Sequence, residues 1–393
     1  MEFEYFENFE ESRERWKRFE RLLETLSLEL KLENVFGMNR FRWNGHELTA
    51  LKNRTKFSSM ILSTSLVIAF VTTRFYPIAI LGEPYEFDAF RECPVYLILG
   101  QYWVGCILAY TTHSDDNIKI MKGIYNLDTS LKLNATEDYY NKARKENVIL
   151  VSFLIVYLAV FHICGIASDG VLTVGGLLYT FVHFYQDLEL FMFYKLLNML
   201  KRRLHILNDW LRKIILNYEN SAKAVDGDED DVATKLHALA ALYYDAGEIC
   251  SSINNVFNFH IFMILISSFA HVIVIQWVAL RSYGSKGDFT VNVMKVTIWS
   301  IRCAYAVLMM CITCEKLLSV RNDTKILVNE MIMDYDRPSR VRRLAKAFMD
   351  LLETSDMKVS IYDMFYVDGA LVFKFLSVCT TYLVVLIQIY HFV

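Results

Sequence analysis

Seven long apolar runs dominate the sequence and restrict the chain to a protein that crosses a lipid bilayer several times. A helix needs roughly 20 apolar residues to span the ~30 Å hydrocarbon core of a bilayer. Hydrophobic residues make up 54% of the 393 residues, above the ~45–50% of a soluble globular protein. The runs lie at about 57–81, 94–112, 147–167, 170–197, 256–280, 293–315 and 366–392. The sequence therefore predicts an all-α membrane protein with seven transmembrane helices.

The distribution of Lys and Arg indicates the orientation. Of 41 such residues, 33 lie before the first run or in alternate loops, three lie in the opposite loops and five lie within the runs. Because positively charged loops stay in the cytoplasm, we expect a cytoplasmic N-terminus and an extracellular C-terminus in the plasma membrane. Three glycosylation sequons fall on the predicted cytoplasmic side, and glycosylation at any of them would contradict this orientation. They are Asn53, Asn134 and Asn322.

The predicted cytoplasmic segments contain amphipathic helices. Apolar residues recur at steps of three and four within 12–32, 200–215 and 339–354. A further helix near 232–255 leads into the fifth run, and the sixth run continues to about Asp334. We therefore expect helical extensions that project beyond the bilayer. Their apolar stripes fit either packing within one subunit or a cytoplasmic hub shared between subunits.

The last run ends in TTYLVVLIQIYHFV, which holds a glutamine among aliphatic residues. An amide that faced lipid would leave its polar atoms unpaired, at a cost in free energy. At a step of about 100° per residue, one narrow face of this helix contains Thr381, Val385, Gln388 and Phe392. Such a face suits a water-filled pore, or a hydrogen bond to another helix of the same subunit.

The stretch TYLVVLIQ (381–388) resembles the motif that ends insect gustatory receptors, a Thr-Tyr pair, five hydrophobic residues and Gln. Members of that family usually continue with Phe, where this chain has Ile389. Residues 359–382 resemble the family's approach to the motif, and 33–41 (ENVFGMNRF) resembles its segment before the first helix.

This resemblance implies a ligand-gated cation channel of four subunits, either identical or related, in which the last helix of each subunit lines one central pore. It also implies a small-molecule tastant that binds in the outer half of each helical bundle. The pore and its gate are then expected at Thr381, Val385, Gln388, Ile389 and Phe392.

With the family's organisation, the chain divides into four segments. They are a cytoplasmic amphipathic segment at 1–56, helices one to six with the ligand-binding bundle at 57–315, cytoplasmic anchor helices at 316–365 and a pore-lining helix at 366–393.

Aromatic and hydrogen-bonding side chains in the outer parts of helices two to six are candidates for binding an organic ligand. They are Tyr102, Trp103, Tyr157, His162, Tyr179, His183, His271, Gln276, Trp277, Trp299, Arg302 and Tyr305. For any one aromatic residue, ordinary packing or a place at the membrane interface is the alternative. Arg302 needs a partner inside the membrane, and Asp169 is a candidate.

The class of ligand follows from the same residues. Sugar-sensing members of the family often carry a glutamate directly after the Thr-Tyr pair, where this chain has Leu383. This difference argues against common sugars and leaves fructose open. An aromatic-rich pocket favours a bitter or plant-derived compound.

Other functions have weaker support in the sequence. The histidines are scattered and no His-Glu-x-x-His motif occurs, so we expect no enzyme activity, no metal and no cofactor. A transporter would show two similar halves and broken helices, and no internal repeat is present. The chain could instead be a channel subunit of the odorant-receptor type. We expect the lipid bilayer and further receptor subunits as partners, and no nucleic acid.

Overall fold

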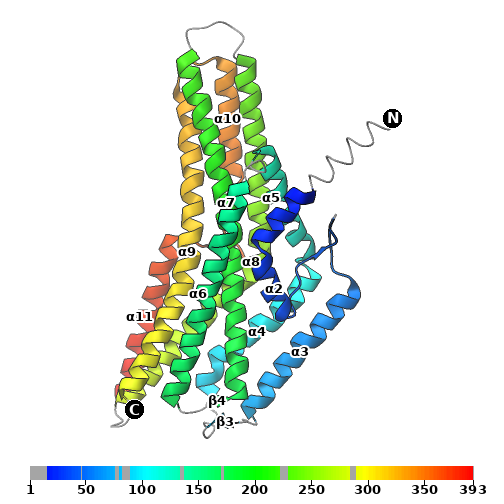
Figure 1. Cartoon of the computed structure of the whole chain (residues 1–393). Helices are drawn as coiled ribbons and strands as arrows, with labels where there is room; N and C mark the ends of the chain where they lie inside the picture. Colours follow the sequence, from blue (N-terminus) through cyan, green and yellow to red (C-terminus); the bar gives the residue numbers. More distant parts are fainter. Residues whose placement is uncertain are drawn as a thin grey trace.

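The computed structural model describes residues 16–45, 47–75, 79–81, 89–132, 137–169, 172–221, 229–283 and 289–392. Seven long helices correspond to the seven predicted spans (Figure 1). They are α3 (Asn53–Phe75), α4 (Ala89–Thr111), α6 (Glu137–Asp169), α7 (Val174–Ser221), α8 (Glu229–Tyr283), α9 (Phe289–Met333) and α11 (Gly369–Phe392). The predicted fold class, an all-α membrane protein with seven long helices, is confirmed.

Hydropathy alone identifies most of these spans. Within the described residues, five helices are long and apolar enough to cross a membrane: α3, α4, α8, α9 and α11. In α7, the charged residues Asp187, Glu189 and Lys195 interrupt the apolar run. Glu189 and Lys195 are buried against neighbouring helices, so these charges do not face lipid.

Three of the helices extend far beyond the length of a membrane span. The helices α7, α8 and α9 have 48, 55 and 45 residues, and α10 (Ser339–Thr354) packs against α8 and α9. Their extended parts and α10 form a four-helix bundle at the top of Figure 1, which we call the anchor bundle. This agrees with the predicted continuation of the fourth and sixth runs and with the predicted helix after Pro338.

The apolar stripes of the anchor bundle pack within one subunit. Leu204 and Leu211 on α7 are almost completely buried in the main hydrophobic core, as are Val341 and Leu352 on α10. The structure therefore favours the first of the two interpretations of these stripes. A charge introduced at Leu204 or Leu211 would destabilise the subunit itself and would not report on contacts between subunits.

The segment before the first span packs against the bundle as two helices. The predicted helix at 12–32 is interrupted at Leu26, and α2 (Ser27–Val35) follows the turn. A hairpin of β1 (Arg42–Trp43) and β2 (Leu48–Thr49) then leads into α3. The loop between the second and third runs, residues 113–146, for which no helix was predicted from the sequence, contains α5 (Ser114–Ser130), which packs against α8.

Two further strand pairs, like the β1–β2 hairpin, lie outside the sequence-based expectations. The predicted first span at 57–81 is wrong at its end, because its helix stops at Phe75 and Ala79–Leu81 (β3) pair with Leu172–Thr173 (β4). Pro77 follows the helix end, and a proline ring lacks the N–H that would continue it. A second hairpin, β5 (Ser360–Ile361) and β6 (Phe365–Tyr366), precedes α11.

The charge bias predicts which end of the bundle faces the cytoplasm. An epitope after Val393 should bind antibody on intact cells, and an epitope before Met1 should do so only after permeabilisation, because 33 of 41 basic residues lie on the predicted inner side. Surface immunostaining of tagged receptors checks this. The reverse staining pattern would mean that the anchor bundle is extracellular.

Candidate functional site

A cluster of polar and aromatic side chains lies between α7, α8 and α9. The His271 ring stacks on Trp299 with centroids 5.0 Å apart and planes 11° apart. His183 lies edge-on to Tyr179 at 4.2 Å and lies 5.1 Å from the Trp299 ring. Four candidates from three helices are thus in mutual contact, and we call them, with Arg302, the aromatic cluster.

The two histidines of the aromatic cluster differ in their hydrogen bonds. Both ring nitrogens of His271 have a hydrogen-bond partner. His271 Nδ1 lies 2.9 Å from the Ser267 carbonyl oxygen, which can only accept, so Nδ1 carries the proton. In the neutral ring Nε2 then accepts from the Tyr179 hydroxyl at 3.2 Å. Both nitrogens of His183 are buried and have no hydrogen-bond partner among the described residues. A ligand with a donor or an acceptor could satisfy them.

The intramembrane arginine has a different partner from the one expected. Arg302 Nη2 lies 2.8 Å from Asp187 Oδ1 on α7, and its guanidinium lies over the Trp299 ring at 5.4 Å. The side chain of Asp169, the expected partner, lies outside the described residues. Asp187 belongs to the same predicted span as Tyr179 and His183. A search for acidic residues within the spans could therefore have identified it as the partner of Arg302.

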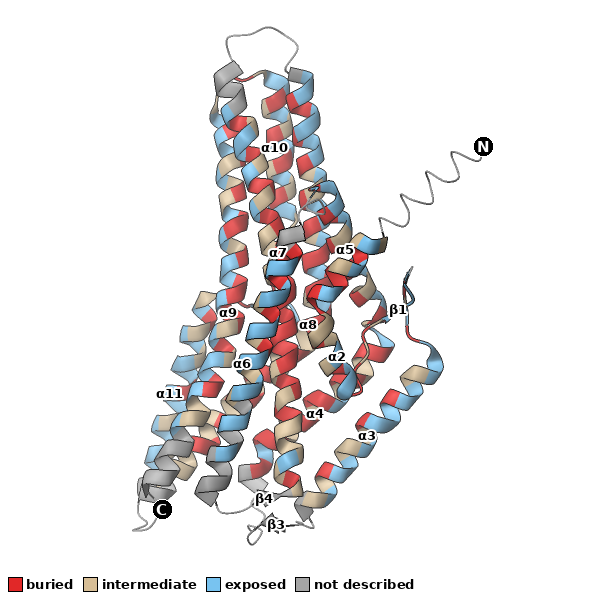
Figure 2. Ribbon diagram, in the orientation of Figure 1, coloured by how far each residue is buried: buried red, intermediate tan, exposed pale blue. Residues whose placement is uncertain are grey.

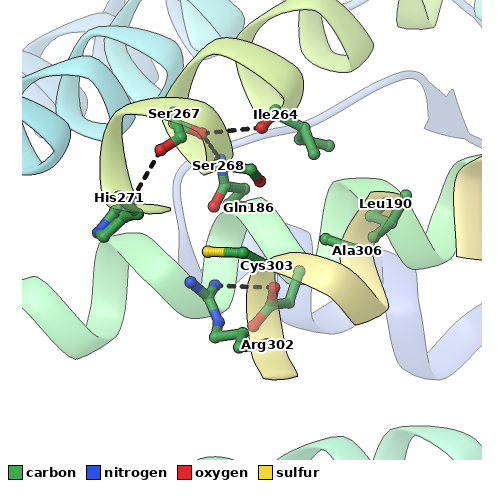
Figure 3. A pocket seen from close by; sticks show the side chains of 10 residues that line it. Gln186, Leu190, Ile264, Ser267, Ser268, His271, Arg302, Cys303 and Ala306 are labelled. Carbon is green, nitrogen blue, oxygen red and sulfur yellow. Dashed lines mark hydrogen bonds and ion pairs between the residues drawn. The ribbon is translucent and has the colours of Figure 1, made fainter. Parts of the chain in front are cut away.

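A small cavity adjoins the aromatic cluster (Figure 3). It is lined by Gln186, Asp187, Leu190, Ile264, Ser267, Ser268, His271, Arg302, Cys303 and Ala306. Gln186 donates to Ser267 Oγ at 2.9 Å and to Gln101 Oε1 at 2.8 Å. The cavity measures about 10 Å³ as the space open to the centre of a water-sized sphere, which is room for about one water molecule. An organic ligand would therefore have to open it by moving side chains.

Other candidates lie outside the aromatic cluster. Tyr102 is buried and donates to the Phe36 carbonyl at 2.9 Å, so it holds the segment before the first span. Trp103 is 40% exposed and donates to Thr64 on α3 at 3.2 Å. The polar atoms of Tyr102 and Trp103 are therefore engaged away from the aromatic cluster.

The remaining candidates are placed less closely. Tyr157 on α6 and Tyr305 on α9 lie near enough to Asp187 to interact with its charge. Gln276 and Trp277 lie further along α8, partly buried. The side chain of His162 lies outside the described residues.

The helix α11 packs against the subunit on one side only. Just 11% of its span is buried, against 56% for α4 and 44% for α8 and α9 (Figure 2). The buried Cys379 and the half-buried Leu383 and Leu386 mark the packed side. The expected pore positions Thr381, Val385 and Gln388 lie on the opposite face and are exposed, and Ile389 is exposed to one side of that face. The side chain of Phe392 lies outside the described residues. Thr381 donates to the Ser377 carbonyl of its own helix at 2.9 Å, and the Gln388 side chain has no hydrogen bond to the described residues.

A family model described as a 7tm chemosensory receptor matches residues 30–390, which is most of the chain and includes the aromatic cluster. The chain belongs to the 7tm chemosensory receptor family. It is therefore a multi-pass membrane receptor and not an enzyme, as expected. The resemblance to insect chemoreceptors that its last helix indicated is confirmed at the level of this family.

Solved structures of similar fold include an insect olfactory receptor. The receptor is similar to the olfactory receptor OR5 from Machilis hrabei, with 12% identity and a TM-score of 0.62 over 94% of this chain and 99% of that one. It is similar to the same olfactory receptor in complex with eugenol, with 13% identity, a TM-score of 0.59 and the same coverage. A comparison with curated protein sequences found no match.

The receptor also contains a buried charge cluster that sequence reasoning missed. Arg40 donates to both oxygens of Glu33 at 2.9–3.0 Å and to Glu189 on α7 at 2.8 Å. All three side chains are at most 3% exposed. Asn117 on α5 accepts a further bond at 3.4 Å. The segment 33–41, which resembles the family, therefore contains both Glu33 and Arg40. The bond from Arg40 to Glu189 joins this segment to the bundle.

Proposed function

We propose that this receptor is a gustatory receptor, a ligand-gated cation channel that opens when a small organic tastant binds. Four copies, or this chain with related subunits, would surround one pore lined by α11. The tastant would bind in the aromatic cluster, and the channel would be a non-selective cation channel that passes both monovalent and divalent cations.

One observation carries this proposal. The helix α11 exposes a face with Thr381 and Gln388 while it packs on the opposite side through Cys379 and Leu386. A polar face turned to lipid would leave the Gln388 amide unpaired. A water-filled axis between subunits solvates that amide and gives an ion a path.

The aromatic cluster supports a planar ligand with a hydrogen-bonding group. Tyr179, His183, His271 and Trp299 offer ring faces, and the nitrogens of His183 offer a donor and an acceptor. A small plant phenol fits these requirements. Eugenol, which is bound in the similar olfactory receptor structure, is a suitable probe.

Recording current from cells that express this chain alone tests the proposal. A panel of small phenolic and alkaloid compounds, with eugenol among them, should evoke a cation current that untransfected cells lack. Purified receptor should form particles with fourfold symmetry. Ligand binding without current at the cell surface, both for this chain alone and after co-expression with related receptor subunits, would contradict the proposed channel function.

Substitutions in the aromatic cluster should weaken the response to the ligand. Trp299→Ala and His183→Ala should each raise the half-maximal agonist concentration about tenfold or more, since losing an aromatic contact or a buried hydrogen bond costs ~1–3 kcal/mol. Trp103→Ala is the matched control, because Trp103 lies against α3 and away from the aromatic cluster. Equal effects of the two Trp variants would place the ligand elsewhere.

An odorant-receptor-like subunit is the second candidate. The two similar solved structures described above are of an olfactory receptor, which favours it. A chain that conducts only when co-expressed with a partner subunit, in response to volatile compounds, would support this candidate over the first.

A further inference from the structure

One charged side chain lies on the exposed face of α11. Lys374 is the only Lys, Arg, Asp or Glu in the 24 residues of this helix. It is exposed, and within the described part of the chain it forms no ion pair or hydrogen bond. A charge on a transmembrane helix is costly unless it meets a partner or water, so its position needs an explanation.

The position of Lys374 follows from helix geometry. Lys374, Thr381 and Gln388 are seven residues apart, and seven steps of about 100° return to within about 20° of the same direction. Ser377 lies between them on the same face and is also exposed. The stripe with the candidate pore residues therefore continues to Lys374, about 10 Å from Thr381 along the axis at ~1.5 Å per residue.

Acidic groups near the start of α11 form no ion pair with Lys374 in the described part of the chain. Asp368 accepts from the Leu371 amide at 3.0 Å, and Glu315 on α9 accepts from the Gly369 amide at 3.0 Å. Both carboxylates thus cap the helix, and Asp368 precedes Lys374 by six residues, which turns it about 120° away. A lysine side chain on a helix leans toward the N-terminal end, here the predicted cytoplasmic end.

We propose that Lys374 forms a ring of positive charge at the cytoplasmic mouth of the pore and selects against divalent cations. This rests on the proposed function, since it requires α11 to line a pore shared by four subunits. The ring repels every cation, and it repels a divalent cation with twice the energy. The factor by which the ring lowers the local Ca²⁺ concentration is therefore the square of the factor by which it lowers the local K⁺ concentration.

The expected size of the effect follows from simple electrostatics. Four charges about 10 Å from the axis, in water at physiological ionic strength, lower the local K⁺ concentration about two- to fivefold. The Ca²⁺ concentration falls about four- to 25-fold by the same reasoning. Because the ring lies at the inner mouth, it hinders outward current more than inward current.

Single-channel recording tests this with the full receptor, using spontaneous openings and openings evoked by eugenol. In symmetrical KCl the unsubstituted channel should pass inward current about two- to fivefold larger than outward current. Lys374→Gln should make the current–voltage relation linear and raise the Ca²⁺-to-K⁺ permeability ratio about two- to fivefold. Lys374→Arg should preserve both properties, and Lys346→Gln, which removes an exposed lysine from α10, should change neither.

A charge-restoring experiment separates charge from side-chain shape. In Lys374→Cys, a positively charged methanethiosulfonate reagent applied from the cytoplasmic side should restore the rectification, and a negatively charged one should reverse it. A linear current–voltage relation in the unsubstituted channel would overturn the proposal, and this measurement needs no variant. So would unchanged permeability ratios in Lys374→Gln.

Substitutions at Gln388 distinguish failure of the charge ring from failure of the proposed function. If substitutions at Gln388 alter conductance while those at Lys374 do not, the pore stands and the charge ring is wrong. In that case Lys374 reaches lipid head groups at the membrane surface. If neither position affects the current, α11 does not line the pore and the proposed function fails with it.

Discussion

Gln388→Cys should make the current sensitive to a small, charged, membrane-impermeant thiol reagent, and more so when agonist is present. Gln388 lies on the exposed face of α11, opposite the side that packs through Cys379 and Leu386. If that face borders water, the new thiol ionises and reacts. Patch-clamp recording before and after the reagent, compared with the unsubstituted receptor, measures the effect.

Gln388→Leu should reduce the conductance at least about tenfold, because each ~1.4 kcal/mol added to a permeation barrier slows passage tenfold. The substitution removes the amide ring and lengthens the dry stretch between Val385 and Ile389, which favours closure by dewetting. Leu386→Cys is the control for reactivity and should stay protected on the packed side. Normal conductance in Gln388→Leu, together with an unreactive cysteine at 388, would place the pore elsewhere.

Arg40→Met should be the most destabilising single change in the segment before the first span. It leaves Glu33 and Glu189 buried without the guanidinium that bonds both, and breaking a buried ion pair in this way costs ~3–5 kcal/mol. We expect most of the protein to be retained inside the cell and the melting temperature of the remainder to fall. Surface labelling and thermal unfolding in detergent measure these effects.

Two variants control for this prediction. Arg42→Ala removes an exposed arginine two residues away and should change stability by no more than ~0.5 kcal/mol. Adding Glu189→Gln to Arg40→Met should recover part of the loss, because one unpaired buried charge is then removed. If Arg40→Met were as harmless as Arg42→Ala, the cluster would contribute nothing to folding.

The cluster also predicts a pH dependence. It holds two carboxylates and one guanidinium, and burial raises the pKa of Glu33 to about 7 against the opposing effect of Arg40. The native state therefore binds the Glu33 proton more tightly than the unfolded chain, whose pKa is near 4.5. Stability should fall as pH rises from about 4.5 to about 7, and Glu33→Gln should flatten this slope.

Local features of the sequence were sufficient to predict the positions of the helices. Each span is a run of apolar residues, and each helix is closed by bonds between residues four apart, so position and length follow from neighbours along the chain. The continuation of α7, α8 and α9 into the anchor bundle was predictable for the same reason. The segment 79–81 was assigned wrongly, because its partner in β4 is far away in the sequence.

The candidate sites were only partly predictable. Tyr179, His183, His271 and Trp299 were among the candidates, but so were Tyr102 and Trp103, which contact other parts of the fold. Composition identifies aromatic residues in outer helix halves, and it does not say which faces of three helices meet. The polar face of α11 was predictable, since it depends on the period of a single helix.

The sequence by itself determined the class of protein, the seven spans and the stripe from Lys374 to Gln388, because each depends on hydropathy or on the period of one helix. Only the tertiary structure decided the pairing of charges. Arg302 bonds Asp187, 115 residues away, and Arg40 bonds Glu189, 149 residues away. A buried charge must find a partner wherever packing brings one, and packing depends on all the helices at once.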